Sequence, residues 1–177
     1  TGTGLECPSK DDRMTEHTEE SVRAEVRAWL DSNWDPDLTL LEWRNRLVDS
    51  GWGMPQWPKE WFGRELSVGL LRVIDEEFKR VDAITVARKG ATTLAGQTIL
   101  THGSDMLKEK FLRRSLTGED AWCQLFSEPG NGSDLAGVMT RAEREGNKYI
   151  VNGQKVWTTS AHLADYGLLL ARTDLDV

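Results

Sequence analysis

A short turn in the second half of the chain combines residue types that bring backbone close to a ligand. It runs from Glu128 to Asp134 and reads EPGNGSD. Pro129 removes one backbone donor and biases Glu128 toward extended geometry, whereas Gly130 and Gly132 tolerate positive φ and allow a close approach. Free N–H groups in such a turn can face an anion or the polar edge of a flat ring. The turn therefore indicates a candidate binding loop.

A second candidate is the triplet Trp157-Thr158-Thr159, which follows an Asn-Gly dipeptide. Residues 148–151 and 154–157 flank Asn152-Gly153, and Asn-Gly is the strongest short-range signal for a two-residue hairpin turn. We therefore expect a hairpin over residues 148–157, with the triplet on or beside its second strand. The turn and the triplet together predict a ligand site with polar edges and an aromatic wall.

Other interpretations stay open at this point. A glycine turn without a partner motif is more often a surface connection. The tryptophan-rich residues 51–63 could form an aromatic platform, but they lack interleaved basic residues, so docking of the tryptophans onto helices is the better hypothesis. The histidines are too scattered to predict a metal site or a catalytic base: His17, His102 and His162.

Charge and composition exclude several classes of protein. The net charge of -7 is the wrong sign for a nucleic-acid binder. The sequence contains no run of eighteen apolar residues, so it predicts no membrane-spanning helix. Acidic residues near the start do not suit a targeting peptide. Cys7 and Cys123 form no metal-ligand spacing, and Cys123 lies in an apolar run that predicts burial. We expect a cytoplasmic protein.

Two linked motifs carry a resemblance to a known family. They are CQLFSEPGNGSDLAG at residues 123–137 and YIVNGQKVWTTSAHLADYGLLLARTD at residues 149–174. Together they resemble the flavin-contacting segment of the acyl-CoA dehydrogenases, of the type found in actinobacteria. A weaker resemblance extends upstream through GWGMPQWPKEW, so it covers most of the chain after about Met14. It implies an FAD cofactor and dehydrogenation of an acyl-CoA thioester to a 2-enoyl-CoA.

The resemblance also implies roles for individual residues. Ser127 closes the edge that contacts the flavin ring, and Ser133 matches a serine that meets the flavin or the thioester arm, which makes it substrate-binding as well. Trp157 resembles the residue that covers the ring, and Thr159 the hydroxyl near its N5 atom. The implied cofactor-binding residues are Gln124, Leu125, Phe126, Ser127, Gly132, Ser133, Trp157, Thr158 and Thr159. Asn131 departs from the family's usual alanine, and Ser160 from its asparagine.

In the family, a glutamate removes the α-proton while the β-hydrogen leaves as hydride to the flavin. That glutamate belongs to a C-terminal helical domain, so no catalytic residue is assigned here and the segment by itself is expected to be inactive. The implied partners are acyl-CoA, an electron-transfer flavoprotein and further subunits of a homo- or hetero-tetramer. Three alternatives remain: an acyl-CoA oxidase, a non-catalytic subunit of a hetero-oligomeric dehydrogenase, and a peptide- or protein-binding β module unrelated to flavins. The last requires both motif matches to be accidental.

Apolar periodicity predicts a series of helices before residue 119. The first covers residues 18–33 with Thr18 as N-cap, and the second runs from Asp35-Pro36 to Ser50-Gly51. Residues 66–84 predict the longest helix. A further segment ends at His102-Gly103, and its small residues at 90–96 indicate close helix packing or a roomy pocket for a bulky acyl group. The last helix follows the N-cap Ser104.

Alternating residues after Gly118 predict strands, which gives an α+β class. We expect a leader outside the fold at residues 1–13, an all-α domain at 14–119, and the start of an antiparallel β domain at 120–177. The rest of the β domain and the C-terminal helical domain are expected to be missing.

Overall fold

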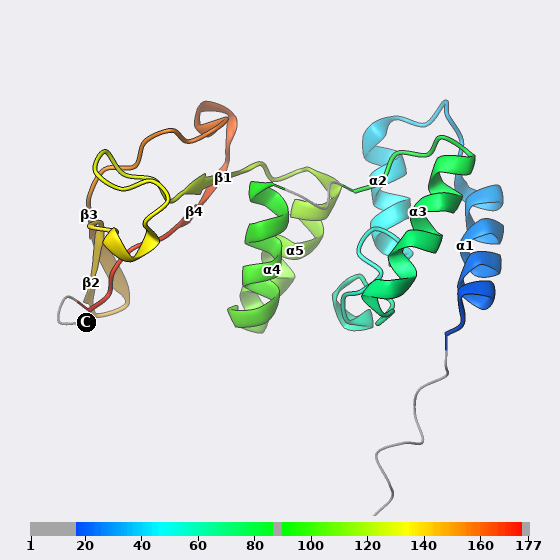
Figure 1. Ribbon diagram of the computed structural model, residues 1–177, viewed down its shortest axis with the longest axis horizontal. Coiled ribbons are helices and arrows are strands. Elements are labelled where there is room, and N and C mark those ends of the chain that lie inside the picture. Colours follow the sequence, from blue (N-terminus) through cyan, green and yellow to red (C-terminus); the bar gives the residue numbers. More distant parts are fainter. Residues whose placement is uncertain (1–16, 87–89, 175–177) are drawn as a thin grey trace, which may run out of the picture.

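The computed structural model describes residues 17–86 and 90–174, so the predicted leader and Met14 lie outside the described residues (Figure 1). Helices come first, and a smaller region with four strands follows. This order confirms the α+β class. Within the described ranges, no helix is long and apolar enough to cross a membrane.

Helix α1 (Glu19–Asn33) begins at a reciprocal capping box. The Thr18 hydroxyl accepts a hydrogen bond from the Ser21 N–H, and the Ser21 hydroxyl accepts one from the Thr18 N–H, each at 3.1 Å. Such caps satisfy donors that the first turn leaves without helical partners. The predicted helix and its N-cap are confirmed. Its buried face consists of residues at helical spacing: Val22, Val26 and Leu30.

Helix α2 (Leu40–Asp49) begins later than the sequence predicted. Asp35 does not cap it, because its carboxylate accepts from the Asp37 N–H at 2.9 Å and closes a separate turn. Thr39 is the N-cap instead, in a capping box with Glu42. The predicted start was therefore wrong, whereas the end at Ser50 is confirmed.

Helix α3 (Leu71–Arg80) is shorter than the predicted range of 66–84. A 3₁₀ turn (Val68–Leu70) precedes it, and Asp82 takes a left-handed conformation, with φ of 54°, soon after its end. A helix cannot continue through that conformation. The prediction that this helix is the longest was wrong, since it has 10 residues and α1 has 15.

Helices α4 (Ala91–His102) and α5 (Asp105–Thr117) lie side by side (Figure 1). Gly103 ends the first and Ser104 is the N-cap of the second, as predicted. At Gly96, a Cβ atom would lie 3.2 Å from the Trp57 ring. The glycine thus allows α4 to pack closely against the tryptophan-rich loop.

The hydrophobic core lies in the helical part and draws on four helices and the tryptophan-rich loop. Trp52 and Trp57 of that loop are at most 2% exposed. The docking hypothesis for the tryptophans is therefore confirmed. Trp43 joins the same core and contacts the ring of Trp34 edge to face, with centroids 4.6 Å apart.

The strands form two separate pairs. Strand β1 (Trp122–Leu125) pairs in parallel with β4 (Tyr166–Leu169), and β2 (Arg141–Glu145) pairs antiparallel with β3 (Lys148–Asn152). The expected antiparallel arrangement therefore holds only for β2 and β3. The pairing of β1 with β4 is parallel because a long connection, which contains the other two strands, brings the chain back in the same direction.

The hairpin predicted over residues 148–157 is not formed. Strand β3 instead pairs with the preceding strand, β2, through a two-residue turn at Gly146-Asn147 in which Gly146 has φ of 61°. Gly153 serves a different purpose: a Cβ atom there would lie 2.3 Å from the Thr140 hydroxyl. It therefore permits a close backbone approach, and Trp157 lies outside any strand.

Candidate cofactor site

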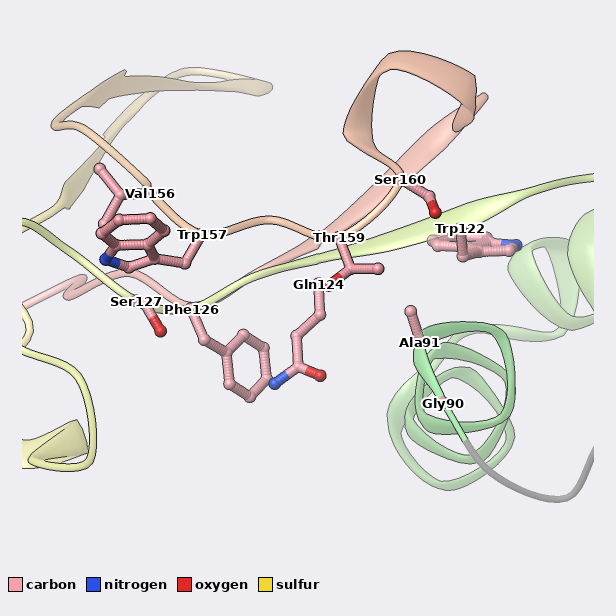
Figure 2. A pocket seen from close by; sticks show the side chains of 10 residues that line it. All are labelled: Gly90, Ala91, Trp122, Gln124, Phe126, Ser127, Val156, Trp157, Thr159 and Ser160. Carbon is pink, nitrogen blue, oxygen red and sulfur yellow. The ribbon is translucent and has the colours of Figure 1, made fainter.

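A pocket of about 500 Å³ lies where the helical part meets the β part (Figure 2). Three stretches of chain enclose it: the start of α4, the strand β1 with the two residues after it, and residues 156–160. Its volume falls in the range of small-molecule and cofactor sites. The lining residues are Gly90, Ala91, Trp122, Gln124, Phe126, Ser127, Val156, Trp157, Thr159 and Ser160.

Alternation along an extended segment supplies one wall. Trp122, Gln124 and Phe126 are two residues apart and all line the pocket. Side chains at this spacing point to the same face of a strand. Figure 2 shows Gln124 and Phe126 between Trp157 and the first turn of α4. Leu125 points to the other face and packs over Gly167 of β4, where a Cβ atom would lie 2.5 Å from the Leu125 Cδ1 atom.

Trp157 has an unusual conformation beside this wall. Its φ is 57°, in the left-handed region, and the residue is 91% exposed. This backbone region is an outlier for a bulky residue, and such conformations are common at ligand sites. The neighbouring Val156 N–H donates to the Ser127 carbonyl at 2.9 Å. That bond joins the two segments that carry the polar and aromatic groups.

An aromatic cluster fixes the opposite end of the pocket. The Trp122 indole N–H donates to the Ser115 hydroxyl of α5 at 2.8 Å. Its ring lies 5.4 Å from that of Phe111 and 5.2 Å from that of Tyr166. These contacts hold Trp122 between α5 and β4, so this wall of the pocket is rigid.

The start of α4 leaves the pocket wide on that side. Gly90 is the N-cap with φ of 96°, a conformation that glycine adopts without cost. Gly90 and Ala91 line the pocket with almost no side chain. The helix N-terminus also carries partial positive charge, which favours electron-rich groups.

Glu128 is buried behind the pocket and does not line it. Its carboxylate accepts hydrogen bonds from the Met139 N–H at 2.7 Å, the Thr140 N–H at 2.8 Å and the Lys155 ammonium at 2.9 Å, as well as from the Thr140 hydroxyl. Hydrogen bonds from Thr140 and Lys155 lower the pKa of Glu128 to about 2. Such a carboxylate is a poor proton acceptor, in agreement with assigning it no role as a base.

The structure brings most of the predicted site residues to one pocket: Gln124, Phe126, Ser127, Trp157 and Thr159 line it. Leu125 and Thr158 do not line it, and Gly132 and Ser133 lie exposed in the glycine turn. Sequence reasoning missed Gly90, Ala91, Trp122, Val156 and Ser160, as well as the buried partners Thr140 and Lys155. The two-residue spacing from Gln124 back to Trp122 could have identified that tryptophan.

The chemistry of the lining suits a flat ring system with polar edges. Aromatic rings come from Trp122, Phe126 and Trp157, and neutral polar groups from Gln124, Ser127, Thr159 and Ser160. Aromatic faces favour stacking on a planar ligand, and hydroxyl and amide groups can bond its edge. An isoalloxazine ring has these properties, so the residues present fit a flavin. In the part of the chain that the structure describes, no group of three or more potential ligands could hold a metal ion.

Comparison with known proteins gives two family matches that cover most of the chain. Residues 11–119 match the acyl-CoA dehydrogenase N-terminal domain, and residues 123–176 match the acyl-CoA dehydrogenase middle domain. A curated relative, the acyl-CoA dehydrogenase IpdE1 of Mycobacterium tuberculosis, is 37% identical over 172 residues. That alignment covers 88% of this chain and 45% of the relative, so the chain spans about half the length of IpdE1.

Solved structures agree with these matches. The ChsE4-ChsE5 complex from Mycobacterium tuberculosis aligns with a TM-score of 0.62 and 30% identity, over 92% of this chain and 45% of the matched chain. A steroid ACAD, Tcur3481-Tcur3483, aligns with a TM-score of 0.60 and 30% identity, over 90% and 44%. The domain matches, the relatives and the pocket lead to the same conclusion: this chain belongs to the acyl-CoA dehydrogenase family.

Proposed function

We propose that this chain supplies one wall of the flavin site of an FAD-dependent acyl-CoA dehydrogenase, which converts an acyl-CoA thioester to a 2-enoyl-CoA. The family consists of FAD-dependent oxidoreductases. The observation that carries the proposal is the single pocket that collects Gln124, Ser127, Trp157 and Thr159 from two distant segments.

Different residues of the pocket would contact different parts of the flavin. Gln124, Ser127 and Thr159 would bond the polar edges of the ring, and Trp157 would cover one of its faces. When bound, the flavin would supply the acceptor for the hydride that leaves the β-carbon of the thioester. Hydroxyl and amide donors at its edge would favour the electron-rich reduced ring. No residue of this chain is assigned as the base.

The remaining parts of the proposal concern the glycine turn and the domain boundaries. Gly132 and Ser133 would meet the flavin or the thioester arm from the exposed turn, and Leu125 and Thr158 would contribute backbone to the site. The chain would divide into a helical domain at 14–119 and a β domain from 120. The last helix of the helical part ends at Thr117 and the first strand begins at Trp122, which supports this division.

We also propose an acyl group of large size and an assembly of several subunits. Gly90 and Ala91 leave space at the pocket wall, and a structural neighbour is a steroid ACAD. An electron-transfer flavoprotein would accept the electrons in the cytoplasm. The ChsE4-ChsE5 complex, which contains two different proteins, supports the alternative of one subunit in a hetero-oligomer.

The test is the visible absorption spectrum of the complete natural protein that contains this chain, followed by anaerobic titration with acyl-CoA thioesters of increasing bulk. We expect flavin bands that bleach, most readily with the bulky thioesters. Turnover that requires oxygen would favour an acyl-CoA oxidase. Absence of flavin after FAD has been added would contradict the proposal for this chain alone.

Side-chain variants test which residues hold the flavin. We expect Ser127→Ala to weaken FAD binding by about fivefold, since one hydrogen bond contributes about 1 kcal/mol. Ser133→Ala tests whether the glycine turn closes onto the cofactor or the substrate. Ser32→Ala, on the exposed face of α1, is the matched control and leaves FAD affinity unchanged.

A further inference from the structure

Lys155 connects two of the three segments that form the pocket, without lining it. Its side chain is 8% exposed, and its ammonium donates to the Phe126 carbonyl and to the Glu128 carboxylate, both at 2.9 Å. These two acceptors lie on either side of Ser127 in the chain. Lys155 itself precedes Trp157 by two residues. One buried cation thus contacts the Ser127 segment from the segment that carries Trp157.

Glu128 extends this link to a segment outside the pocket. Its carboxylate, in a residue that is 6% exposed, also accepts from the Met139 and Thr140 N–H groups, which lie just before β2. All the contacts are charge-assisted or made by fixed backbone donors, which are the stronger kinds of hydrogen bond. The low pKa of Glu128 keeps the carboxylate ionised opposite Lys155 at neutral pH.

Regular structure does little to hold these segments together. Strand β1 ends at Leu125, and residues 153–158 belong to no strand. Between residues 126–128 and 155–157, the backbone hydrogen bond runs from the Val156 N–H to the Ser127 carbonyl. A buried ion pair adds little stability compared with apolar side chains of similar size, because desolvation of the charges offsets their attraction. The main effect of this ion pair is therefore to fix the relative positions of the two segments.

We propose that Glu128 and Lys155 are positioning residues, which set the distance and orientation of the Ser127 segment relative to Trp157 and thereby determine how tightly the pocket binds a flavin. This inference rests on the proposed function. It assigns the pair no contact with the cofactor and no proton transfer. Removing the pair would change the shape of the site even where the protein remains folded.

The experiment compares FAD affinity with thermal stability in the complete natural protein. The double variant Glu128→Gln/Lys155→Met removes both charges, so neither is left buried and unpaired, and we expect the FAD-free variant to melt at a temperature close to that of the FAD-free wild type. FAD affinity should nevertheless fall about tenfold or more. Metal affinity falls by this order when residues that orient the ligands of a metal site are lost. The matched control is Lys59→Met/Glu65→Gln, an exposed pair at 3.7 Å, and it should change neither quantity.

Each outcome has one meaning. Wild-type FAD affinity in the folded double variant would overturn the positioning role. Affinity that falls while the melting temperature is kept supports it. If the double variant does not fold, Lys155→Arg keeps the charge but moves the donor atoms, and unchanged FAD affinity in that variant would also overturn the role. A wild-type protein that binds no FAD would contradict the proposed function and is distinguishable from these results.

Discussion

In the helical part, Trp43, Leu47 and Phe78 are at most 1% exposed and belong to one core, whereas every residue of β3 in the β part is exposed. The pocket takes Gly90 and Ala91 from the first part and its polar and aromatic groups from the second. Stability and ligand contacts are therefore supplied by different regions. A rigid helical body can carry a site whose loops have few apolar contacts of their own.

Each region also contains a buried glutamate, and the two are held differently. Glu77 is bound by three arginines from α1 and α3: Arg23, Arg27 and Arg80. Hydrogen bonds, that from Arg27 above all, lower its pKa to about 2. Glu128 is held by one lysine and by backbone N–H groups directly behind the pocket. The first glutamate joins two helices, and the second joins loops.

The largest expected effect separates the core from the exposed strand. Phe78→Ala should lower the free energy of unfolding by about 3–5 kcal/mol, because it leaves a cavity among buried side chains. Val151→Ala on β3, at a site 48% exposed, should change it by about 0.5 kcal/mol or less. Urea denaturation followed by circular dichroism measures both. Equal losses would show that the β part contributes a core of its own.

A smaller effect is expected for the arginine cluster. Glu77→Gln should cost about 2 kcal/mol of unfolding free energy, less than for a fully buried pair because its arginine partners are partly solvated. Glu143→Gln, at an exposed position of β2, is the control and should have an effect of about 0.5 kcal/mol or less. A neutral result for Glu77→Gln would mean that the cluster does not join α1 to α3.

Acid should remove the difference between the wild type and Glu77→Gln. The pKa of Glu77 is about 2 in the folded chain and near the ordinary glutamate value of 4.5 when unfolded. A lowered pKa contributes stability that is fully present above about pH 4.5 and is lost as the pH falls toward 2. Thermal melts of both proteins between pH 7 and pH 2 should therefore converge in this window. Curves that stay parallel would contradict the low pKa.

The smallest effect concerns helix caps. Thr39→Ala removes the hydroxyl that accepts from the Glu42 N–H and should cost about 1 kcal/mol. Ser104→Ala, at the N-cap of α5, should cost less, since no side-chain cap hydrogen bond is formed there. The difference in melting temperature between the two variants is the measurement. The reverse order would mean that Ser104 caps its helix in solution.

Local signals predicted the helical part well and the β part less well. Thr18, Gly103 and Ser104 mark helix ends because caps depend on neighbouring residues alone. Where two local signals compete, the sequence could not decide between them. Asp35 and Thr39 both suit an N-cap, and the capping box with Glu42 selected the second.

The hairpin prediction was wrong for a similar reason. Asn152-Gly153 and Gly146-Asn147 are both turn dipeptides, and pairing with β2 selected the second. That choice depends on contacts between distant residues, such as Gly153 against Thr140. The motifs nevertheless identified half of the pocket lining, because Gln124, Phe126, Ser127, Trp157 and Thr159 lie within the two segments that carry the family resemblance. That Gly90 lines the pocket, and that Lys155 contacts Phe126 and Glu128, could be seen only in the folded structure.

The exposed ring of Trp157 gives this protein a built-in optical probe. Of the eight tryptophans in the sequence, the other seven are buried or half-buried, whereas Trp157 is 91% exposed. An indole in water emits at longer wavelength than one in an apolar core and is open to collisional quenchers such as iodide. The red edge of the intrinsic emission should therefore report on this single residue. Protection from iodide when a ligand is added would follow occupancy of the site without any label.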